Sequence, residues 1–294
     1  MKALFHIVLF VSGFPLKVLY LFSDLIFFGI YHVAGYRKKV VYKNIRNSFP
    51  DKTEQELRKI MVDFYSNFSD YLVETIKSFT ISSTELRVRV QHINQDLFRQ
   101  AKKDGKNIIM LSGHVFNWEW FNALATVVPQ ENCYPVYRKV NSSFWEEQIK
   151  KIRGSYGNEA IEANDVIKHI FRNKNNGNSI YMFVADQTPH INVVDYGVMF
   201  LNQATPAFIG YDKLATRMNL CFIYCDMKKV KRGFYQVNYY EIKPDAEKFT
   251  EHEVVRKFHS LLERTIRKDP ANYLWSHRKW KNSGSIKHLD KESV

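Results

Sequence analysis

The sequence predicts an α/β fold, in which a mixed central sheet is flanked by helices on both faces and preceded by an N-terminal hydrophobic membrane-anchoring segment. Two observations lead to this prediction. Apolar runs at residues 108–111 and 179–185 alternate with stretches of helical spacing, and uninterrupted apolar strands are typical of a sheet covered on both faces. Residues 3–36, in contrast, carry only two formal charges, Lys17 and Asp24. We therefore expect an anchor at residues 1–36, a catalytic domain at 37–281 and a polar tail at 282–294.

The N-terminal segment is apolar but interrupted. Its longest uncharged run, residues 3–16, has 14 residues, which is short of the roughly 20 needed for an upright span. Pro15 and Lys17 divide the segment into two halves, and no convincing cleavage site of a signal peptide follows it. We expect a partly inserted or re-entrant anchor, although a buried core hairpin stays an alternative. The basic cluster that follows, free of acidic residues, would attract anionic headgroups and hold this flank on the cytoplasmic side; it comprises Arg37, Lys38, Lys39, Lys43 and Arg46.

Helices are expected where apolar residues recur every three to four positions. Residues 51–77 place Leu57, Ile60 and Phe64 on one face, and Thr53 with Glu56 three residues later is typical of a capping box. The helical segments predicted by this spacing are residues 51–77, 117–127, 142–156, 165–173, 205–218 and 251–267.

Strands are expected where short apolar runs lack helical spacing. The predicted strands are residues 88–93, 108–111, 133–137, 179–185, 220–226 and 234–242. A helix is expected to begin soon after the first of them. The sequence has no internal repeat and no long low-complexity linker, and the polar tail after Lys281 is expected to be mobile.

Charge and cysteine content narrow the class of protein. The formal net charge is +13, but no zinc finger or RNA-binding signature accompanies it, so a membrane partner is favoured and nucleic acid is not expected. The three cysteines, Cys133, Cys221 and Cys225, are too few for a disulfide scaffold in 294 residues and suit a reducing compartment. They form no Cys-x-x-Cys pair, and a His-Glu-x-x-His pattern is absent, so neither a metal site nor a cofactor is predicted. Cys221 and Cys225 are expected to be buried in a strand.

His114 and Glu119 are the candidate catalytic residues. On one continuous helix, five positions correspond to about 140°, so the two side chains would diverge. They can converge if His114 lies in the turn after the strand and Glu119 lies in the first turn of the next helix. Gly113 would permit such a turn, and Asn117 is a plausible N-cap. Glu119 could then accept one imidazole proton and leave the other nitrogen as a base. The alternative is a surface pair or a buried structural histidine.

Further polar residues follow the other predicted strands. Arg138 follows residues 133–137, and Asp186-Gln187 follows residues 179–185. Functional groups gather where strands of such a sheet end. Arg138 and Arg153 would suit a phosphate-bearing or otherwise anionic substrate. Alternatively, Arg138 is a solvated loop cation and Arg153 forms a salt bridge at a helix end.

The segment 273–281 combines two tryptophans with four basic side chains and allows two interpretations. It could meet the membrane interface or an acidic carrier protein. Alternatively, the tryptophans cover the sheet edge and the cations are solvated. For Trp275 we favour the structural role.

Taken together, these motifs resemble the bacterial lipid A biosynthesis acyltransferases, which are late acyltransferases of the lysophospholipid acyltransferase superfamily. The resemblance extends over almost the whole chain. The matching stretches are Tyr36-Arg37 to Asn44 with Ser48-Phe49-Pro50, Gly113-His114 with Asn117-Trp118-Glu119, Tyr137-Arg138 with Asn141, Arg153 with Gly157, Asp186-Gln187, and the run from Trp275 to Lys281.

The resemblance implies a membrane-associated acyltransferase at the cytoplasmic face of the cell inner membrane, active in lipopolysaccharide biosynthesis. Its donor would be a thioester of acyl carrier protein or coenzyme A, and its acceptor a hydroxyl of a lipid A precursor. His114 would be the general base, and Glu119 would orient it. Arg138 and Arg153 would bind a phosphate of either substrate.

The remaining implied binding residues are Asn141, Gln187 and Asp186, the last of which could equally be structural. Three alternatives to the implied function stay open. The first is acylation of another glycolipid or aminolipid. The second is a hydrolase in which water replaces the acceptor hydroxyl, and the third is a lipid-binding protein without catalysis.

Overall fold

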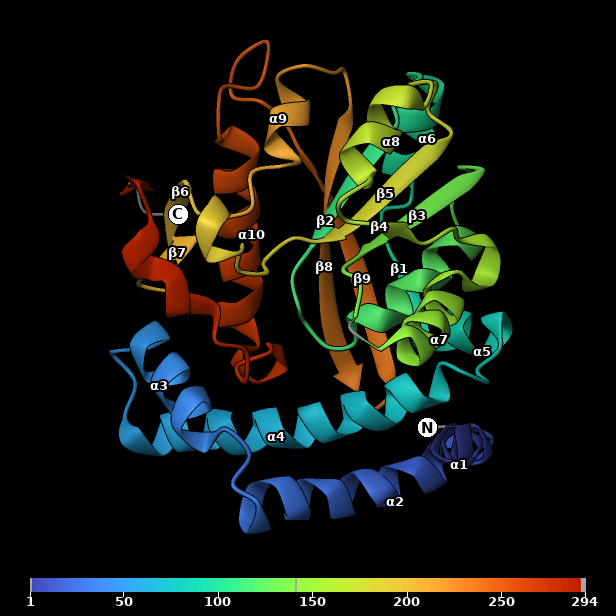
Figure 1. Ribbon diagram of the computed structural model, residues 1–294, viewed down its shortest axis with the longest axis vertical. Coiled ribbons are helices and arrows are strands. Elements are labelled where there is room, and N and C mark those ends of the chain that lie inside the picture. Colours follow the sequence, from blue (N-terminus) through green and yellow to red (C-terminus); the bar gives the residue numbers. More distant parts are fainter. Residues whose placement is uncertain (1, 141, 292–294) are drawn as a thin grey trace.

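The computed structural model describes residues 2–140 and 142–291, and its central feature is a mixed sheet. Over these residues, seven strands form this sheet in the order β1-β9-β8-β2-β5-β3-β4, and a second sheet has the order β10-β6-β7 (Figure 1). The large sheet consists of β1 (Val90–His92), β2 (Ile108–Ser112), β3 (Asn132–Tyr137), β4 (Ile161–Glu162), β5 (Ser179–Val184), β8 (Cys221–Lys231) and β9 (Phe234–Ile242). The small sheet consists of β6 (Tyr196–Phe200), β7 (Gln203–Pro206) and β10 (His288–Asp290).

The α-helices either precede β1 in the chain or alternate with the later strands. They are α1 (Lys2–Ser12), α2 (Leu16–Phe27), α3 (Lys38–Ser48), α4 (Glu54–Lys77), α5 (Ser83–Arg89), α6 (Asp96–Lys103), α7 (Ser143–Arg153), α8 (Val166–Arg172), α9 (Asp212–Ala215) and α10 (Glu253–Lys268). A π-helix, η1 (Phe28–Val33), continues α2. The 3₁₀ helices are η2 (Trp118–Thr126), η3 (Ser155–Gly157), η4 (Ile191–Val193), η5 (Pro270–Asn272) and η6 (Lys279–Ser285).

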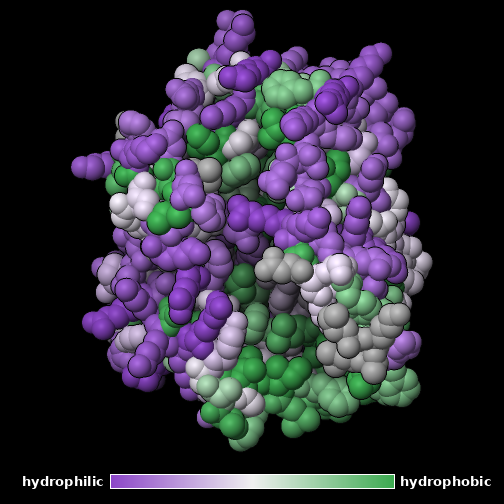
Figure 2. Space-filling view, in the orientation of Figure 1, coloured by the Kyte–Doolittle hydropathy of each residue, from purple (hydrophilic) through white to green (hydrophobic). Residues whose placement is uncertain are grey.

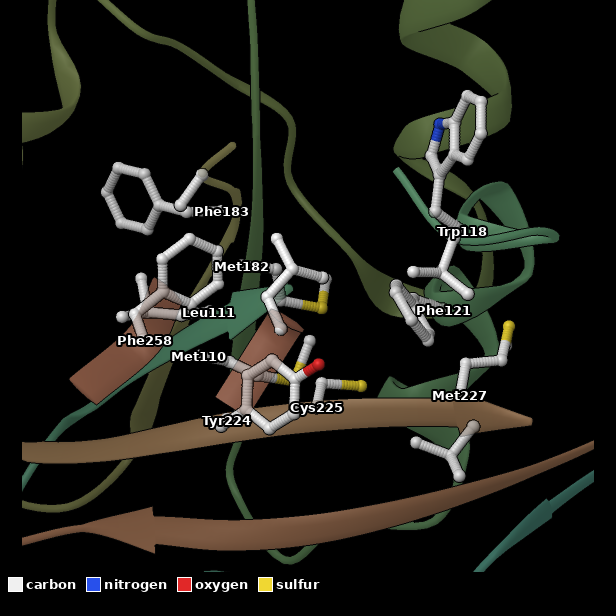
Figure 3. Packing of buried hydrophobic residues seen from close by; sticks show 14 of the residues in the cluster. Met110, Leu111, Trp118, Phe121, Met182, Phe183, Tyr224, Cys225, Met227 and Phe258 are labelled. Carbon is white, nitrogen blue, oxygen red and sulfur yellow. The ribbon is translucent and has the colours of Figure 1, made fainter. Parts of the chain in front are cut away.

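The sheet is buried on both faces, as the apolar runs predicted. β2 pairs in parallel with β5 and β8, while β8 and β9 form an antiparallel pair, so the sheet is mixed. Every residue of β2 is buried. Met110 and Met182 are register partners on one face, and Leu111 and Phe183 are partners on the other. In Figure 3, Leu111 lies near Phe258 of α10, whereas Met182 points toward Phe121.

Different helices cover the two faces. Ring contacts place α8 against Tyr181, the N-cap residue of α9 against Phe183, and α10 against Tyr224. The strand register puts these three side chains on one face. Phe98 of α6 contacts Tyr239 on the opposite face. The predicted α/β class with a mixed, covered sheet is therefore confirmed.

The N-terminal segment packs along α4. Its α2 lies beside α4 at one end of the molecule (Figure 1). Leu16, Leu19 and Ser23 face α4 and are buried, whereas Leu21 and Leu25 on the other side are 66% and 68% exposed. Figure 2 shows hydrophobic side chains gathered at this end of the molecule. The stretch from Leu16 to Val33 is long and apolar enough to cross a membrane, judged by length and composition.

The capping box and both buried cysteines of β8 are confirmed. Thr53 caps α4 by accepting a hydrogen bond from the backbone of Glu56, and the Glu56 carboxylate accepts one from the backbone of Thr53 at 2.8 Å. Cys221 and Cys225 are buried within β8. The helix expected at residues 117–127 is present over Trp118–Thr126, but as the 3₁₀ helix η2 instead of an α-helix.

Two predictions for the C-terminal half are wrong. The helix expected at residues 205–218 is limited to α9, because residues 203–206 pair with β6 in an antiparallel ladder. In the tail expected to be mobile, the described residues 282–291 instead include the end of η6 and the strand β10, which pairs in parallel with β6. The strands β6, β7 and β10 are so short that their sequence pattern cannot be distinguished from that of a loop.

Candidate active site

The candidate residues come together at the ends of three neighbouring strands. His114 follows β2, Arg138 follows β3 and Asp186 follows β5, and these strands are parallel. A cleft of about 670 Å³ opens there. The predicted site residues that line it are His114, Glu119, Arg138, Arg153 and Gln187. Asn141 lies outside the described residues.

The imidazole of His114 is held by Asp186. Its Nδ1 lies 2.6 Å from Oδ1 of Asp186, and the same carboxylate oxygen accepts the backbone N–H of His114 at 3.1 Å. Because a carboxylate only accepts, Nδ1 carries the proton, and Nε2 is left as the basic nitrogen. This arrangement is the one that a general base requires.

Asp186 is buried and remains ionised. Burial alone would raise its pKa, but electrostatic interactions with His114 and Lys279 hold the pKa well below its usual range, with help from hydrogen bonds. One of these comes from Tyr273, whose hydroxyl donates to Oδ2 at 2.8 Å. Asp186 is therefore built to hold and orient the imidazole, and its position favours the structural alternative over a direct substrate contact.

The expectation that Glu119 accepts the imidazole proton is wrong. Glu119 instead forms a two-point ion pair with Arg153, at 2.8 Å to Nη2 and 3.3 Å to Nε. The indole of Trp118 also donates to it, at 3.1 Å. Burial acts to raise the pKa of Glu119, but Arg153 outweighs this effect and the net pKa is lowered. The predicted turn is present, with Asn117 as N-cap, yet it turns Glu119 toward Arg153.

A segment after α10 supplies residues that the sequence did not identify as part of the site. Tyr273 pairs with Val115 in an isolated bridge, and Leu274 donates its N–H to the carbonyl of His114 at 3.1 Å. Lys279 is 2% exposed and donates to the carbonyl oxygen of Asp186. Burial lowers the pKa of Lys279. The solvated role considered for the cations of this segment is therefore wrong for Lys279.

Trp275 has the structural role that we favoured. It is 0% exposed, and its indole donates to the carbonyl of Pro270. The density of aromatic and basic residues in the segment 273–281 was the available signal, but it did not indicate which of them would reach the site.

The sequence matches a known protein family. The family model for bacterial lipid A biosynthesis acyltransferases matches residues 3–282, which is nearly the whole chain. The chain belongs to this family. No significant match was found among curated proteins. Membership makes the chain an acyltransferase of lipid A and lipopolysaccharide biosynthesis, in which an acyl group passes from a donor to a lipid acceptor.

The cleft has the mixed lining that such an acyltransferase needs. Its polar groups lie at the strand ends, while Met110, Phe121 and Met182 contribute apolar surface. Arg138 is exposed at the edge of this cleft, and Arg153 lies deeper, on Glu119. An apolar surface beside convergent polar groups suits a ligand with an acyl chain and an anionic part.

Gly113 is required by close packing in this acyltransferase, and not by the unusual backbone conformation that the sequence suggested. An added Cβ would lie 2.5 Å from Cδ1 of Leu262 in α10, and the φ angle of Gly113 is outside the left-handed range. We expect Gly113→Ala to lower the free energy of unfolding by about 1–3 kcal/mol through overpacking, and to shift His114 beside it.

Urea unfolding measures this effect, and Gly284→Ala is the matched control, because nothing lies within 4 Å of its added Cβ. In the Leu262→Ala background, Gly113→Ala should lower the free energy of unfolding by less than it does in the wild-type protein, because the clashing side chain is absent. Equal stability of the two glycine variants would contradict the packing argument.

The pair between Arg153 and Glu119 is expected to matter for stability as well as for the cleft. Arg153→Ala leaves Glu119, whose side chain is only 13% exposed, without its cation, which should lower the free energy of unfolding by about 3–5 kcal/mol at pH 7. Lys151→Ala removes a pair with Glu147 in which both side chains are more than 60% exposed. That loss should stay within about 0.5 kcal/mol. Chemical denaturation of both variants measures the difference, and similar losses would refute the prediction.

Proposed function

We propose that this acyltransferase moves a fatty acyl chain from a thioester, carried by acyl carrier protein or coenzyme A, to a hydroxyl of a lipid A precursor. The observation that carries the proposal is His114 held through Nδ1 by a buried, ionised Asp186 at a cleft with both apolar and cationic lining. Such a histidine can take a proton from an alcohol, and the cleft can receive an acyl chain.

In the proposed reaction, Nε2 of His114 removes the proton from the acceptor hydroxyl as its oxygen attacks the thioester carbonyl carbon. The carbon–oxygen bond forms and a tetrahedral intermediate carries the negative charge. Its collapse breaks the carbon–sulfur bond, and the departing thiolate takes the proton from the imidazolium. Asp186 stabilises that imidazolium throughout, because it is anionic and bonded to Nδ1. No covalent enzyme intermediate is required.

Arg138 is the proposed site for a phosphate of the acceptor or of the donor's phosphopantetheine. It is exposed and lines the cleft, and within residues 2–140 and 142–291 it forms no salt bridge with a carboxylate. Gln187 lines the same cleft and is a proposed hydrogen-bonding residue, and Asn141 is proposed on the family resemblance. Arg153 with Glu119 would form the polar wall beside the reacting groups.

The test gives purified full-length protein in detergent an acyl carrier thioester or an acyl coenzyme A, with and without tetra-acylated or penta-acylated lipid A precursor. Acyl transfer to the precursor supports the proposal, and the preferred thioester identifies the donor. Free fatty acid released without an acceptor would support the hydrolase instead. Transfer only to another glycolipid or aminolipid would replace the acceptor, and no turnover with any lipid would favour a binding protein.

We further propose that the N-terminal helices hold the enzyme at the cytoplasmic face of the inner membrane. Leu21, Leu25 and Phe28 project from α2 and η1 and are 66%, 68% and 59% exposed. The basic cluster from Arg37 to Arg46 follows them, which would favour anionic headgroups.

Charged substitutions on this face should release the protein from membranes. A charge within hydrocarbon costs roughly 2.5–3.5 kcal/mol, so Leu21→Glu/Leu25→Glu should lower the membrane-bound fraction more than about 10-fold. Sedimentation with anionic vesicles measures this fraction. Phe171→Glu, on α8, is the control because Phe171 is also 50% exposed. Equal sedimentation of the two variants would mean that another surface binds the membrane.

A further inference from the structure

A buried carboxyl in α4 connects the N-terminal helices with the turn that carries Glu119. Glu74 is 0% exposed. Its Oε1 accepts a hydrogen bond from Tyr20 of α2 at 2.8 Å. Its Oε2 accepts one from Tyr235 of β9 at 2.7 Å and one from Nδ2 of Asn117 at 3.0 Å. Three elements that are far apart in the sequence therefore meet at one side chain.

Asn117 is held in a single orientation by this contact. It is 0% exposed, its Nδ2 donates to Glu74, and its Oδ1 accepts the backbone N–H of Glu119 at 3.1 Å. A carboxylate can only accept and a backbone N–H can only donate, so only one of the two amide orientations satisfies both neighbours. Glu74 thus selects the orientation in which Asn117 caps η2.

The consequences of that orientation reach the cleft. The capped turn places Glu119 on Arg153 and beside the indole of Trp118. The Trp118 ring packs edge-on against the imidazole of His114, with 4.8 Å between the ring centroids. A reoriented Asn117 would therefore move groups on both sides of the proposed reaction site.

Stability alone does not explain a carboxyl at this position. Burial raises the pKa of Glu74, which reflects the cost of placing an ionisable group away from water. An apolar side chain would avoid this cost, and buried polar groups can instead specify one arrangement of their neighbours. Here the specified arrangement joins α2, β9 and the active-site turn.

We propose that Glu74 is a positioning residue that couples the docking of α2 on α4 to the geometry of the active-site turn. The N-terminal helices then support turnover directly, in addition to any role in membrane binding. The turnover part of this inference rests on the acyl transfer proposed above. A second readout, hydrogen exchange of residues 113–126, needs no substrate and tests the coupling by itself.

The first experiment exchanges the carboxylate and the amide of the hydrogen bond between Glu74 and Asn117. Asn117→Asp places two acceptors face to face and should lower kcat at least about 10-fold, since small displacements of reacting groups are costly. Glu74→Gln/Asn117→Asp restores one donor and one acceptor with the total charge unchanged. It should return kcat to within about threefold of wild type and restore slow hydrogen exchange in residues 113–126. Glu74→Gln alone should also stay near wild type, because its oxygen can face Asn117 while its amide donates to Tyr20.

The second experiment compares two hydrogen bonds that both fasten α2 to α4. Tyr20 donates to Glu74, whereas Ser23 donates to Asp70 at 2.7 Å, one helical turn away from Glu74. Tyr20→Phe should lower kcat severalfold and speed exchange in residues 113–126, while Ser23→Ala should change neither by more than about twofold.

Two results would overturn the inference: equal effects of Tyr20→Phe and Ser23→Ala on exchange, or a double variant no better than Asn117→Asp. If instead the exchange pattern appears as expected but no acyl transfer occurs with wild-type protein, the proposed function has failed and the coupling stands.

Discussion

Replacing His114 with alanine is expected to lower kcat for acyl transfer by about 10²–10⁴-fold, the range that a general base contributes. Asp186 holds the side chain through Nδ1, so the variant loses the Nε2 nitrogen that would take the proton of the acceptor hydroxyl. Binding of the donor thioester should change little, because the imidazole acts on the acceptor hydroxyl. Steady-state transfer assays at saturating acceptor measure kcat directly.

The matched control for this prediction is His288→Ala, which removes an exposed histidine from β10. It should retain wild-type kcat. Circular dichroism should show both variants folded, since His114 is a partly exposed residue and its loss leaves the sheet intact. Wild-type kcat in His114→Ala would remove the general base from the mechanism.

The parallel core of the fold was predictable because its signal is local. Buried strands such as β2 and β5 are apolar runs in the sequence, and the Thr53–Glu56 capping box indicates where helix α4 begins. The small sheet was not predictable, because β6 and β7 are short strands of one hairpin and β10 pairs with β6 across 92 positions, as in His288 with Tyr196. Pairing over such distances leaves no trace in local periodicity.

The sequence predicted several of the polar residues that lie together at the candidate site, but not how they pair. Strand ends drew attention to His114, Arg138 and Asp186, because parallel strands bring their carboxyl ends together. Sequence spacing then favoured Glu119 as the partner of His114. The structure instead pairs His114 with Asp186, 72 positions away, because β2 and β5 are neighbours.

The ion pair between Glu119 and Arg153 is also non-local. Arg153 is the last residue of α7, 34 positions from Glu119, so their contact depends on how distant parts of the chain fold together. Spacing along the chain can indicate which residues gather at one edge of a sheet. It cannot rank the contacts among them.

Asp186→Asn is expected to lower kcat by about 10²–10⁴-fold while keeping the shape of the site. One orientation of the new amide still accepts from Nδ1 of His114 and donates to Tyr273, so the ring geometry can survive. The negative charge that stabilises the imidazolium is lost, however, and the buried ammonium of Lys279 then lies beside a neutral group. Transfer assays should therefore show a large loss in kcat and a small change in KM.

Acid unfolding gives an independent measurement of the same residue. The folded-state pKa of Asp186 is lowered from its ordinary value of 3.8, so the carboxylate contributes stability above that value and loses it as pH falls further. Asp186→Asn should lack this part of the pH dependence. Asp212→Asn is the matched control, because Asp212 is also buried but accepts backbone N–H groups at the start of α10. Asp212→Asn should lower the free energy of unfolding but leave kcat of the folded protein unchanged. If both variants lost kcat equally, Asp186 would act through the stability of the fold and not through His114.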